Sequence, residues 1–464
     1  MSYLIYPLAF IFILGSAVVI HEFGHFLVAK LFKIRVETFS VGFGPRLFGK
    51  KWGDTDYRVS AIPLGGYVKL GGDESNSPIE GEGASDIPVS ERFDLRPRWQ
   101  RILVALAGPV MNVLTALSIP LAGALLYGVP QSPPPVVSYV AASGAAQAAG
   151  VQAGDRIVSF NGTENPGWDT IHGDALLSPG QPLPLVVERG GQRVPLTITP
   201  TVHTEEGETV GFLDLVPDNG GYPIVIRSVA KDGPAGEAGV QPGDRVLAVN
   251  GQPLRSAEHF GIFIREHRSE PITLTINRNG QKQEVTATPR RQSDGIERLG
   301  VTHGDDYPLV KPSLVAAASY AVRSNLEILR LTGKALGQFF SGKRSARNTL
   351  SGPIGIYKAA GSAVERSGWA GFFTMLGFLS LNLGIFNLLP IPVLDGGAIF
   401  LLLIEAVLGT VGMKVSMRVR DRIQQVGFVM VLLLMVFVIT NDLLKTASNW
   451  SGGSNKPAAT TPGK

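Results

Sequence analysis

The sequence predicts an α-helical polytopic membrane protein with four transmembrane helices and two inserted β-rich domains. Two observations predict this fold class. The chain has 464 residues, of which 44% are apolar, and it contains four apolar runs of about the length that crosses a bilayer. A motif of 14 residues also occurs twice between the second and the third run.

The four runs contain few ionisable residues, apart from a cluster in the first run. A transmembrane helix needs about 20 mostly apolar residues. The first run has no basic leading segment and no small-residue cleavage site, so we interpret it as a retained helix rather than a signal peptide. A fifth run, residues 398–408, is short and contains Glu405, which favours a segment that does not cross the membrane. The four predicted spans are residues 4–32, 102–129, 370–390 and 423–444.

Basic residues predict the orientation of the spans, because short cytoplasmic loops are rich in Lys and Arg. No Lys or Arg precedes the first span. We therefore expect the loops after the first span and before the last one to be cytoplasmic, and both termini and the large insert to lie on the other side. The basic residues of these two loops are Lys30, Lys33, Arg35, Arg46, Lys50 and Lys51, and Lys414, Arg418, Arg420 and Arg422.

The insert contains two copies of one domain. AGVQAGDRIVSFNG, residues 149–162, recurs as AGVQPGDRVLAVNG, residues 238–251, so that Gly150 and Gly239 are 89 residues apart. Each copy continues into a predicted helix and then a β-hairpin, which turns at Gly190 and Gly191 in the first copy and at Asn279 and Gly280 in the second.

Six regions follow from these patterns. A Pro-rich segment, residues 129–135, is a stiff spacer before the first copy, residues 312–341 have the pattern of an amphipathic helix, and the last residues have the composition of a disordered tail. The predicted regions are 1–128 with the first two spans, 136–221 and 222–307 for the two copies, 312–368 at the membrane surface, 369–450 with the last two spans, and 451–464 as the tail.

The composition excludes several kinds of site. The chain contains no cysteine, so a disulfide framework and a thiolate metal site are both excluded, and a bound metal must use His and carboxylate ligands. The formal charge is only +4, and no basic block is interleaved with aromatic residues. A nucleic-acid partner is therefore not expected.

The first span contains HEFGH, residues 21–25, which predicts a metal site. His21 and His25 lie one helical turn apart, so both imidazoles are on one face and can bind one zinc ion. Glu22 can accept a proton from the attacking water without binding the metal. The alternative is a chance match with histidines hydrogen-bonded in a core. The energetic cost of ionisable groups inside a span makes that alternative weaker.

Asp395 is the predicted third ligand. A catalytic zinc usually has three protein ligands, and Asp395 follows an apolar run broken by Pro390 and Pro392. The alternative is that Asp395 caps the short helix that follows. An acidic residue at the membrane boundary, in a chain that already offers two imidazoles, favours the ligand.

Four motifs in the same chain resemble one family. HEFGH in the first span, AGPVMN at residues 107–112, FNLLPIPVLDGG at residues 386–397 and the two GDR-containing repeats are together similar to the site-2 protease family of intramembrane zinc metalloproteases. The resemblance implies that His21, His25 and Asp395 bind Zn²⁺, that Glu22 is the general base, and that the reaction is hydrolysis of a peptide bond in or beside a transmembrane helix.

The resemblance also implies residues that bind substrate. Asn382 and Asn387 match family asparagines near the site, although hydrogen bonding between helices is an equal alternative. IPLGGYVKLGG, residues 62–72, is similar to a membrane-associated β-hairpin that pairs with an unwound substrate, which gives Gly65, Gly66 and Tyr67 a substrate-binding role. An ordinary cytoplasmic hairpin is the alternative. Ala398 after LDGG departs from the polar residue that many relatives are expected to carry.

The two repeats resemble PDZ domains, which bind extended peptides by strand addition. The resemblance implies a multi-pass protein of the bacterial inner membrane, with both termini and the PDZ-like domains in the periplasm and the active site toward the cytoplasm. The implied partners are membrane lipid and single-span substrates of the anti-sigma-factor type, first trimmed by another protease, and remnant signal peptides. A membrane-anchored PDZ scaffold or chaperone with a vestigial metal site is the alternative function, and a metal transporter is a third.

Overall fold

The computed structural model describes residues 2–73, 87–131, 133–205, 208–267, 269–291, 297–342, 352–411, 413 and 416–451. The chain forms two compact units. The first consists of Met1–Leu126, Pro312–Arg330 and Leu350–Asp442, and the second consists of Tyr127–Lys311, Leu331–Thr349 and Leu443–Lys464. The predicted tail lies outside the described residues apart from Ser451, the last residue of a helix.

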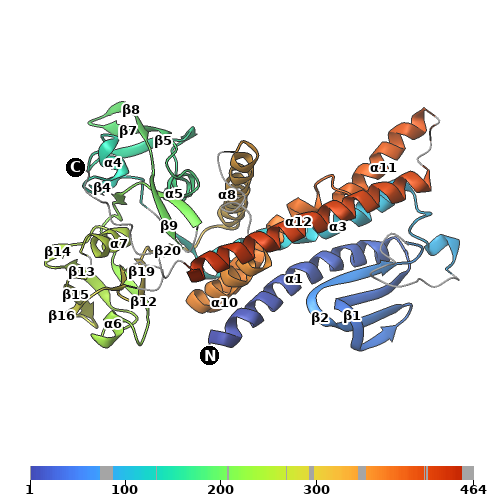
Figure 1. Ribbon diagram of the computed structural model, residues 1–464, viewed down its shortest axis with the longest axis horizontal. Helices are drawn as coiled ribbons and strands as arrows, with labels where there is room; N and C mark the ends of the chain where they lie inside the picture. The colour runs from blue at the N-terminus through green and yellow to red at the C-terminus, as the bar shows by residue number, and fades with distance from the viewer. Residues whose placement is uncertain are drawn as a thin grey trace, which may run out of the picture. The chain divides into compact units, whose positions relative to one another are not determined.

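Within the described part of the chain, four helices are long and apolar enough to cross a membrane (Figure 1). The third helix begins earlier than the predicted span because residues 353–369 continue the helical segment, in which Gly368 has a non-helical backbone with φ of 55°. The four helices are α1 (Ser2–Leu31), α3 (Arg98–Tyr127), α10 (Pro353–Asn387) and α12 (Met417–Ser451), with candidate spans Leu4–Leu31, Arg98–Tyr127, Pro353–Asn387 and Arg422–Leu444.

Small residues allow these helices to approach closely. A Cβ added to Gly24 of α1 would lie 2.3 Å from the Ala107 carbonyl oxygen of α3, and one added to Gly384 of α10 would lie 2.9 Å from the Pro109 carbonyl oxygen. Close backbone contact through small residues is the usual way in which helices pack in lipid. These two contacts place the middle of α3 against both α1 and α10.

Two long strands beside α1 form a single curved sheet (Figure 1). The strands are β1 (Val36–Trp52) and β2 (Thr55–Leu70). The first half of β1 pairs with both halves of β2, since Thr38 lies opposite Lys69 on one side and Asp56 on the other. The second half of β1 pairs with the first half of β2. The end of β2, residues 66–70, is therefore an edge strand.

Outside the repeats, the described residues form two further α-helices and one 3-10 turn. Leu314–Phe340 forms α8, an α-helix in the region that the sequence predicts to be amphipathic. Asp395–Thr410 forms α11, which is the fifth apolar run, and Val89–Glu91 is a 3-10 turn. Glu405 of α11 forms an ion pair with Arg420 of α12.

The two repeats have separate hydrophobic cores of similar composition. Phe160 and Ile171 are fully buried in the first core, and Phe260 and Ile272 are fully buried in the second. Each predicted hairpin is confirmed, with β7 (Leu183–Arg189) paired to β8 (Gln192–Ile198) and β15 (Ile272–Arg278) paired to β16 (Gln281–Ala287).

The remaining elements of the repeats are short. In the first repeat they are β4 (Val137–Val140), α4 (Ala145–Ala148), β5 (Arg156–Phe160), β6 (Thr163–Glu164), α5 (Trp168–Leu176), β9 (Thr201–Glu205), β10 (Glu208–Phe212) and β11 (Leu215–Pro217). In the second they are β12 (Ile224–Val229), α6 (Pro234–Glu237), β13 (Arg245–Val249), β14 (Gln252–Pro253), α7 (Ala257–Glu266), β17 (Arg290–Arg291), β18 (Glu297–Arg298) and β19 (Val301–Asp305); β3 (Val129–Pro130) and β20 (Leu309–Val310) pair with each other.

Candidate metal centre

Helix α1 presents His21 and His25 on one face, as the spacing predicts. Their ring centroids are 4.8 Å apart, and the two Nε2 atoms are 3.2 Å apart. His21 is 5% exposed, so the site begins in the packed interior of the helices rather than on the lipid-facing surface.

Asp395 reaches the two histidines from the start of α11. The chain turns between α10 and α11 through Pro390 and Pro392, and Val393 has a positive φ of 85°. A Cβ at Gly396 or Gly397 would lie 2.3 Å or 2.2 Å from backbone atoms of the turn, so both positions require glycine. The N-cap of α11 is Leu394, with no side-chain cap, and the alternative that Asp395 caps the helix is therefore wrong.

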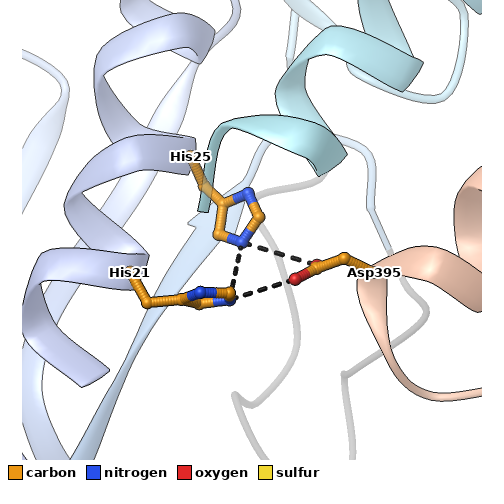
Figure 2. A group of neighbouring side chains, drawn as sticks. All are labelled: His21, His25 and Asp395. Atoms are coloured by element: carbon orange, nitrogen blue, oxygen red, sulfur yellow. Dashed lines mark hydrogen bonds and ion pairs between the residues drawn. The ribbon is translucent and has the colours of Figure 1, made fainter. Parts of the chain in front are cut away.

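The three side chains converge on one point (Figure 2). His21 Nε2 is 3.0 Å from Asp395 Oδ2, and His25 Nε2 is 3.4 Å from Asp395 Oδ1. With ligand bonds of about 2.0 to 2.2 Å, a tetrahedral zinc site places neighbouring ligand atoms about 3.3 to 3.6 Å apart. The separations of the ligand atoms, 3.0 to 3.4 Å, are within a few tenths of an ångström of this range, so the three side chains could hold a single zinc ion.

Helix α3 orients both imidazoles. His25 Nδ1 donates a hydrogen bond of 2.7 Å to the Val104 carbonyl oxygen, which leaves Nε2 with its lone pair directed toward Asp395. A Cβ at Gly108 would lie 2.3 Å from His25 Nε2 and 2.8 Å from His21 Cε1. Any larger residue at Gly108 would therefore displace the ligands.

Asn112 of α3 contacts the other face of His21. It is fully buried, and its side-chain amide lies 3.3 Å from His21 Nδ1. Among the described residues its Oδ1 has no hydrogen-bond partner. Rotating the amide by half a turn lets His21 Nδ1–H donate to this oxygen, which satisfies both groups and frees His21 Nε2 for the metal.

The sequence motif AGPVMN contains both Gly108 and Asn112. Sequence reasoning used this motif only for the family resemblance and missed the contacts of the two residues with the histidines. A buried Asn in an apolar span is the signal that could have identified one of them, because polar groups in lipid need a partner.

Glu22 lies on the side of α1 that faces the sheet. Its carboxyl group is hydrogen-bonded to the backbone of Val68 in β2, and a Cβ at Gly66 would lie 3.7 Å from Glu22 Cγ. The edge strand at Gly66 and Tyr67 therefore runs beside Glu22. Gly65 has a φ of 154°, and a side chain there would overlap the Phe43 ring.

The two predicted asparagines have different positions. Asn387, the last residue of α10, has its Nδ2 atom 3.2 Å from His21 Nε2 and thus lies at the centre. Asn382 lies more than one turn earlier, and its Nδ2 donates a 2.8 Å hydrogen bond to the Phe378 carbonyl of the same helix. The structure brings Asn387, but not Asn382, into contact with the metal-binding residues.

The family model named Peptidase family M50 matches residues 9–434. The chain belongs to peptidase family M50. The predicted resemblance to the site-2 proteases is therefore confirmed, and the chain is a zinc metalloprotease, as its family implies.

Relatives in family M50 match the chain over nearly its whole length. The chain is 32% identical over 463 residues to the regulator of sigma-E protease RseP of Escherichia coli, covering 94% of this chain and 97% of the relative. It is 33% identical over 456 residues to a Neisseria meningitidis protein whose name assigns it to the zinc metalloproteases, covering 94% and 98%. Among solved structures, the PDZ domain of the SdrC-like protein of Listeria monocytogenes is 17% identical and covers 17% of this chain and 85% of that domain, with a TM-score of 0.17.

Proposed function

We propose that the chain cleaves peptide bonds within the membrane, with His21, His25 and Asp395 as zinc ligands and Glu22 as general base. One observation carries the proposal. Two ligands and the base lie on a helix that is apolar enough to span a bilayer, and the third ligand completes the set at the same depth. When bound, zinc polarises the scissile carbonyl and makes water acidic enough to lose a proton near neutral pH.

Glu22 moves the proton in this proposal. It accepts the proton of the attacking water and then donates it to the leaving amine. The hydrogen bond to Val68 holds the carboxyl group between the metal-binding residues and the edge strand. Asn387, close to His21 Nε2, is placed to donate a hydrogen bond to a substrate carbonyl at the centre.

The edge strand supports the proposed binding of an unwound substrate. Residues 66–70 pair with β1 on one side only, so their other side can pair with an added strand. Gly65, Gly66 and Tyr67 would hold the substrate backbone next to Glu22. Asn382 would contact the substrate further along α10, since its position is half-buried and lies five residues before Asn387.

We infer the substrates and the topology from the family. RseP is named as a regulator of sigma-E, which supports single-span substrates of the anti-sigma-factor type, trimmed beforehand by another protease. The Lys and Arg residues after α1 support a bacterial inner-membrane protein with this loop in the cytoplasm and the repeats in the periplasm. Regions 136–221 and 222–307 would then be PDZ-like domains that limit access to the site, and 312–368 would lie at the membrane surface.

The test uses the full chain in lipid with a tagged single-span substrate. Glu22→Gln is expected to keep its zinc and to reduce cleavage by about a hundredfold or more, because general acid–base catalysis contributes that much. Glu365→Gln is the control, since Glu365 accepts a hydrogen bond from Tyr6 away from the centre. Equal cleavage by wild type and Glu22→Gln would refute the mechanism and favour a scaffold with a vestigial metal site.

A further inference from the structure

A charged cavity lies in the sheet formed by β1 and β2, away from the metal centre. Its volume is about 340 Å³. It is lined by three basic and three acidic residues, namely Arg35, Arg46 and Lys51, and Glu37, Asp54 and Asp56. The formal charges of the lining balance, so the cavity suits a ligand that carries separated charges of both signs better than it suits a bare metal ion or a polyanion.

The contacts of the sheet with α1 indicate where the cavity lies relative to the membrane. A Cβ at Gly15 would lie 3.4 Å from the Pro63 carbonyl oxygen, whereas Ala29 shares a buried cluster with Val36 and Leu70. Gly15 and Ala29 are about 21 Å apart along a helix with a rise of 1.5 Å per residue. The sheet therefore follows α1 through much of the hydrocarbon thickness, which is about 30 Å.

The cavity lies at the end of the sheet that is next to the basic end of α1. Arg35 and Glu37 follow α1 directly, and Asp54 forms the turn between β1 and β2. Arg46 lies further along the sheet, and its side chain reaches back to Asp56 with a separation of 3.2 Å. These positions place the cavity at the level of the lipid headgroups.

Arg35 and Lys51 have N–H donors that can bind an anionic group in the cavity. Arg35 is 3.7 Å from Asp54 and 3.9 Å from Glu91, which is beyond hydrogen-bond distance. Among the described residues its buried Nε atom has no hydrogen-bond partner, and Lys51 forms no ion pair with any of them. A phosphate ester suits such donors, because charge-assisted hydrogen bonds to phosphate are strong.

The surface next to the cavity is apolar and aromatic. Trp52 is 80% exposed, Phe48 is 64% exposed and Leu47 is 63% exposed, all on the strand that carries Lys51. Trp with flanking Lys is typical of the boundary between hydrocarbon and headgroups. These exposed apolar side chains favour a ligand that is part of a lipid over a soluble phosphate ester.

We propose that this cavity binds the zwitterionic headgroup of a phospholipid that carries a phosphate and a primary ammonium group. Arg35, Arg46 and Lys51 bind the phosphate, and Asp54, whose side chain is 63% exposed, accepts hydrogen bonds from the ammonium. A bound lipid would hold the charged end of the sheet at the headgroup level. The proposal depends on the membrane placement of α1 and not on the protease activity.

The matched pair for the test is Lys51→Gln and Lys50→Gln. The two lysines are adjacent on one strand and point to opposite faces, and only Lys51 lines the cavity. Full-length protein is reconstituted with equal amounts of phosphatidylethanolamine, phosphatidylcholine and phosphatidylglycerol, and the retained lipid is counted by native mass spectrometry. We expect wild type and Lys50→Gln to retain phosphatidylethanolamine, and Lys51→Gln to retain roughly tenfold less, as for the loss of one charged hydrogen bond.

Three results would overturn the proposal. They are equal retention of the three lipids, preference for phosphatidylglycerol, and unchanged retention by Lys51→Gln. Equally tight binding of soluble glycerophosphoethanolamine would overturn the assignment to a lipid. Arg35→Gln provides a second variant in the same assay, with an expected loss similar to that of Lys51→Gln, and melting temperatures of all variants verify that they are folded.

Discussion

The two repeats have the same contacts around their GDR motifs and differ in their last strands. In the first, Arg189 donates to both oxygens of the buried Asp155 and to the Gly150 carbonyl. In the second, Arg278 does the same to Asp244 and Gly239, with every partner 89 residues later. The buried Asp of the shared GDR motif thus forms the same ion pair in both repeats, with the Arg that ends β7 or β15. This part of each repeat serves stability.

The last strand of the repeats breaks this equivalence. Ala146 N–H donates to the Leu213 carbonyl in the first repeat, and its counterpart Ala235 donates to the Leu299 carbonyl in the second. Matched residues earlier in the repeats are 89 positions apart, whereas Leu213 and Leu299 are only 86 positions apart. The first repeat therefore has three more residues than the second before its last strand. Asp214 then takes the place of Gly300, and Pro217 takes the place of His303.

These residue differences should affect peptide binding by strand addition. Gly300 has a φ of 77° before the edge strand β19. Asp214, at the matched position, places a carboxylate there that accepts hydrogen bonds from Ala145 N–H and Thr201 Oγ1. Pro217 has no N–H to offer to an added strand. A repeated scaffold can thus keep its core while the last strand of each copy offers different backbone donors and charges to an added strand.

The largest expected effect tests the shared core. Asp155→Asn and Asp244→Asn should each lower the free energy of opening of their own repeat by about 2 kcal/mol, because a charged hydrogen-bond network is broken. Hydrogen exchange on the full chain measures each repeat separately. A large loss of protection in one variant and none in the other would show that the two ion pairs do not contribute equally to stability.

A somewhat smaller effect sharpens the difference between the last strands. A peptide with a free C-terminal carboxylate should slow amide exchange in β19 and leave β11 unchanged. Gly300→Asp, which gives the second repeat the residue of the first, should weaken binding roughly tenfold through charge repulsion. Asp214→Gly should leave the peptide affinity unchanged. Slowed exchange in β11 of the wild type would contradict this assignment.

Helix α8 provides a third test, since it forms an ion pair with the first repeat. Lys334 is 2.9 Å from the fully buried Asp174, while residue 263 at the matched position of the second repeat is Phe. Lys334→Ala should reduce protection of the first repeat by about 1 kcal/mol, because Asp174 keeps its hydrogen bond from Asn161. Lys311→Ala, at an exposed site, is the control. An equal loss in the second repeat would count against a contact specific to the first.

The smallest effect concerns pH. Burial lowers the pKa of His259 and of His303 in the second repeat, whereas the matched residues of the first, Thr170 and Pro217, do not titrate. These histidines stay neutral when folded and take up protons when unfolded, near the ordinary pKa of about 6.5. The second repeat should therefore lose protection as the pH falls below about 6.5.

The carboxylates of the shared ion pairs act at lower pH and in both repeats. Burial raises the pKa of Asp155 and Asp244, but the hydrogen bonds from Arg189 and Arg278 outweigh it and hold both pKa values below the ordinary range. Their stabilisation is present at neutral pH and is lost as the pH falls below about 3.9. Exchange measured at about pH 7.5, 5.5 and 3 distinguishes the two effects. Parallel losses in both repeats at pH 5.5 would refute the histidine contribution.

The sequence by itself determined the features that depend on local periodicity. The spacing of His21 and His25 follows from the helical repeat, the apolar runs predict the helices, and the turns at Gly190 and Asn279 predict the hairpins. These need only short segments of the chain, and the structure has all of them. The start of α10 at Pro353 lies outside the predicted span, because Glu365, Arg366 and Gly368 separate the apolar residues that precede them from the apolar run after residue 369.

Only the tertiary structure decided which distant groups meet. Asp395 reaches His25 because two glycines let the turn before α11 pack tightly, and Asn112 reaches His21 because Gly24 lets α3 approach α1. The slip of the last strand from an offset of 89 to one of 86 residues is likewise visible only in the pairing. Such contacts depend on how closely two backbones can pack, which is a property of both segments together and of neither alone.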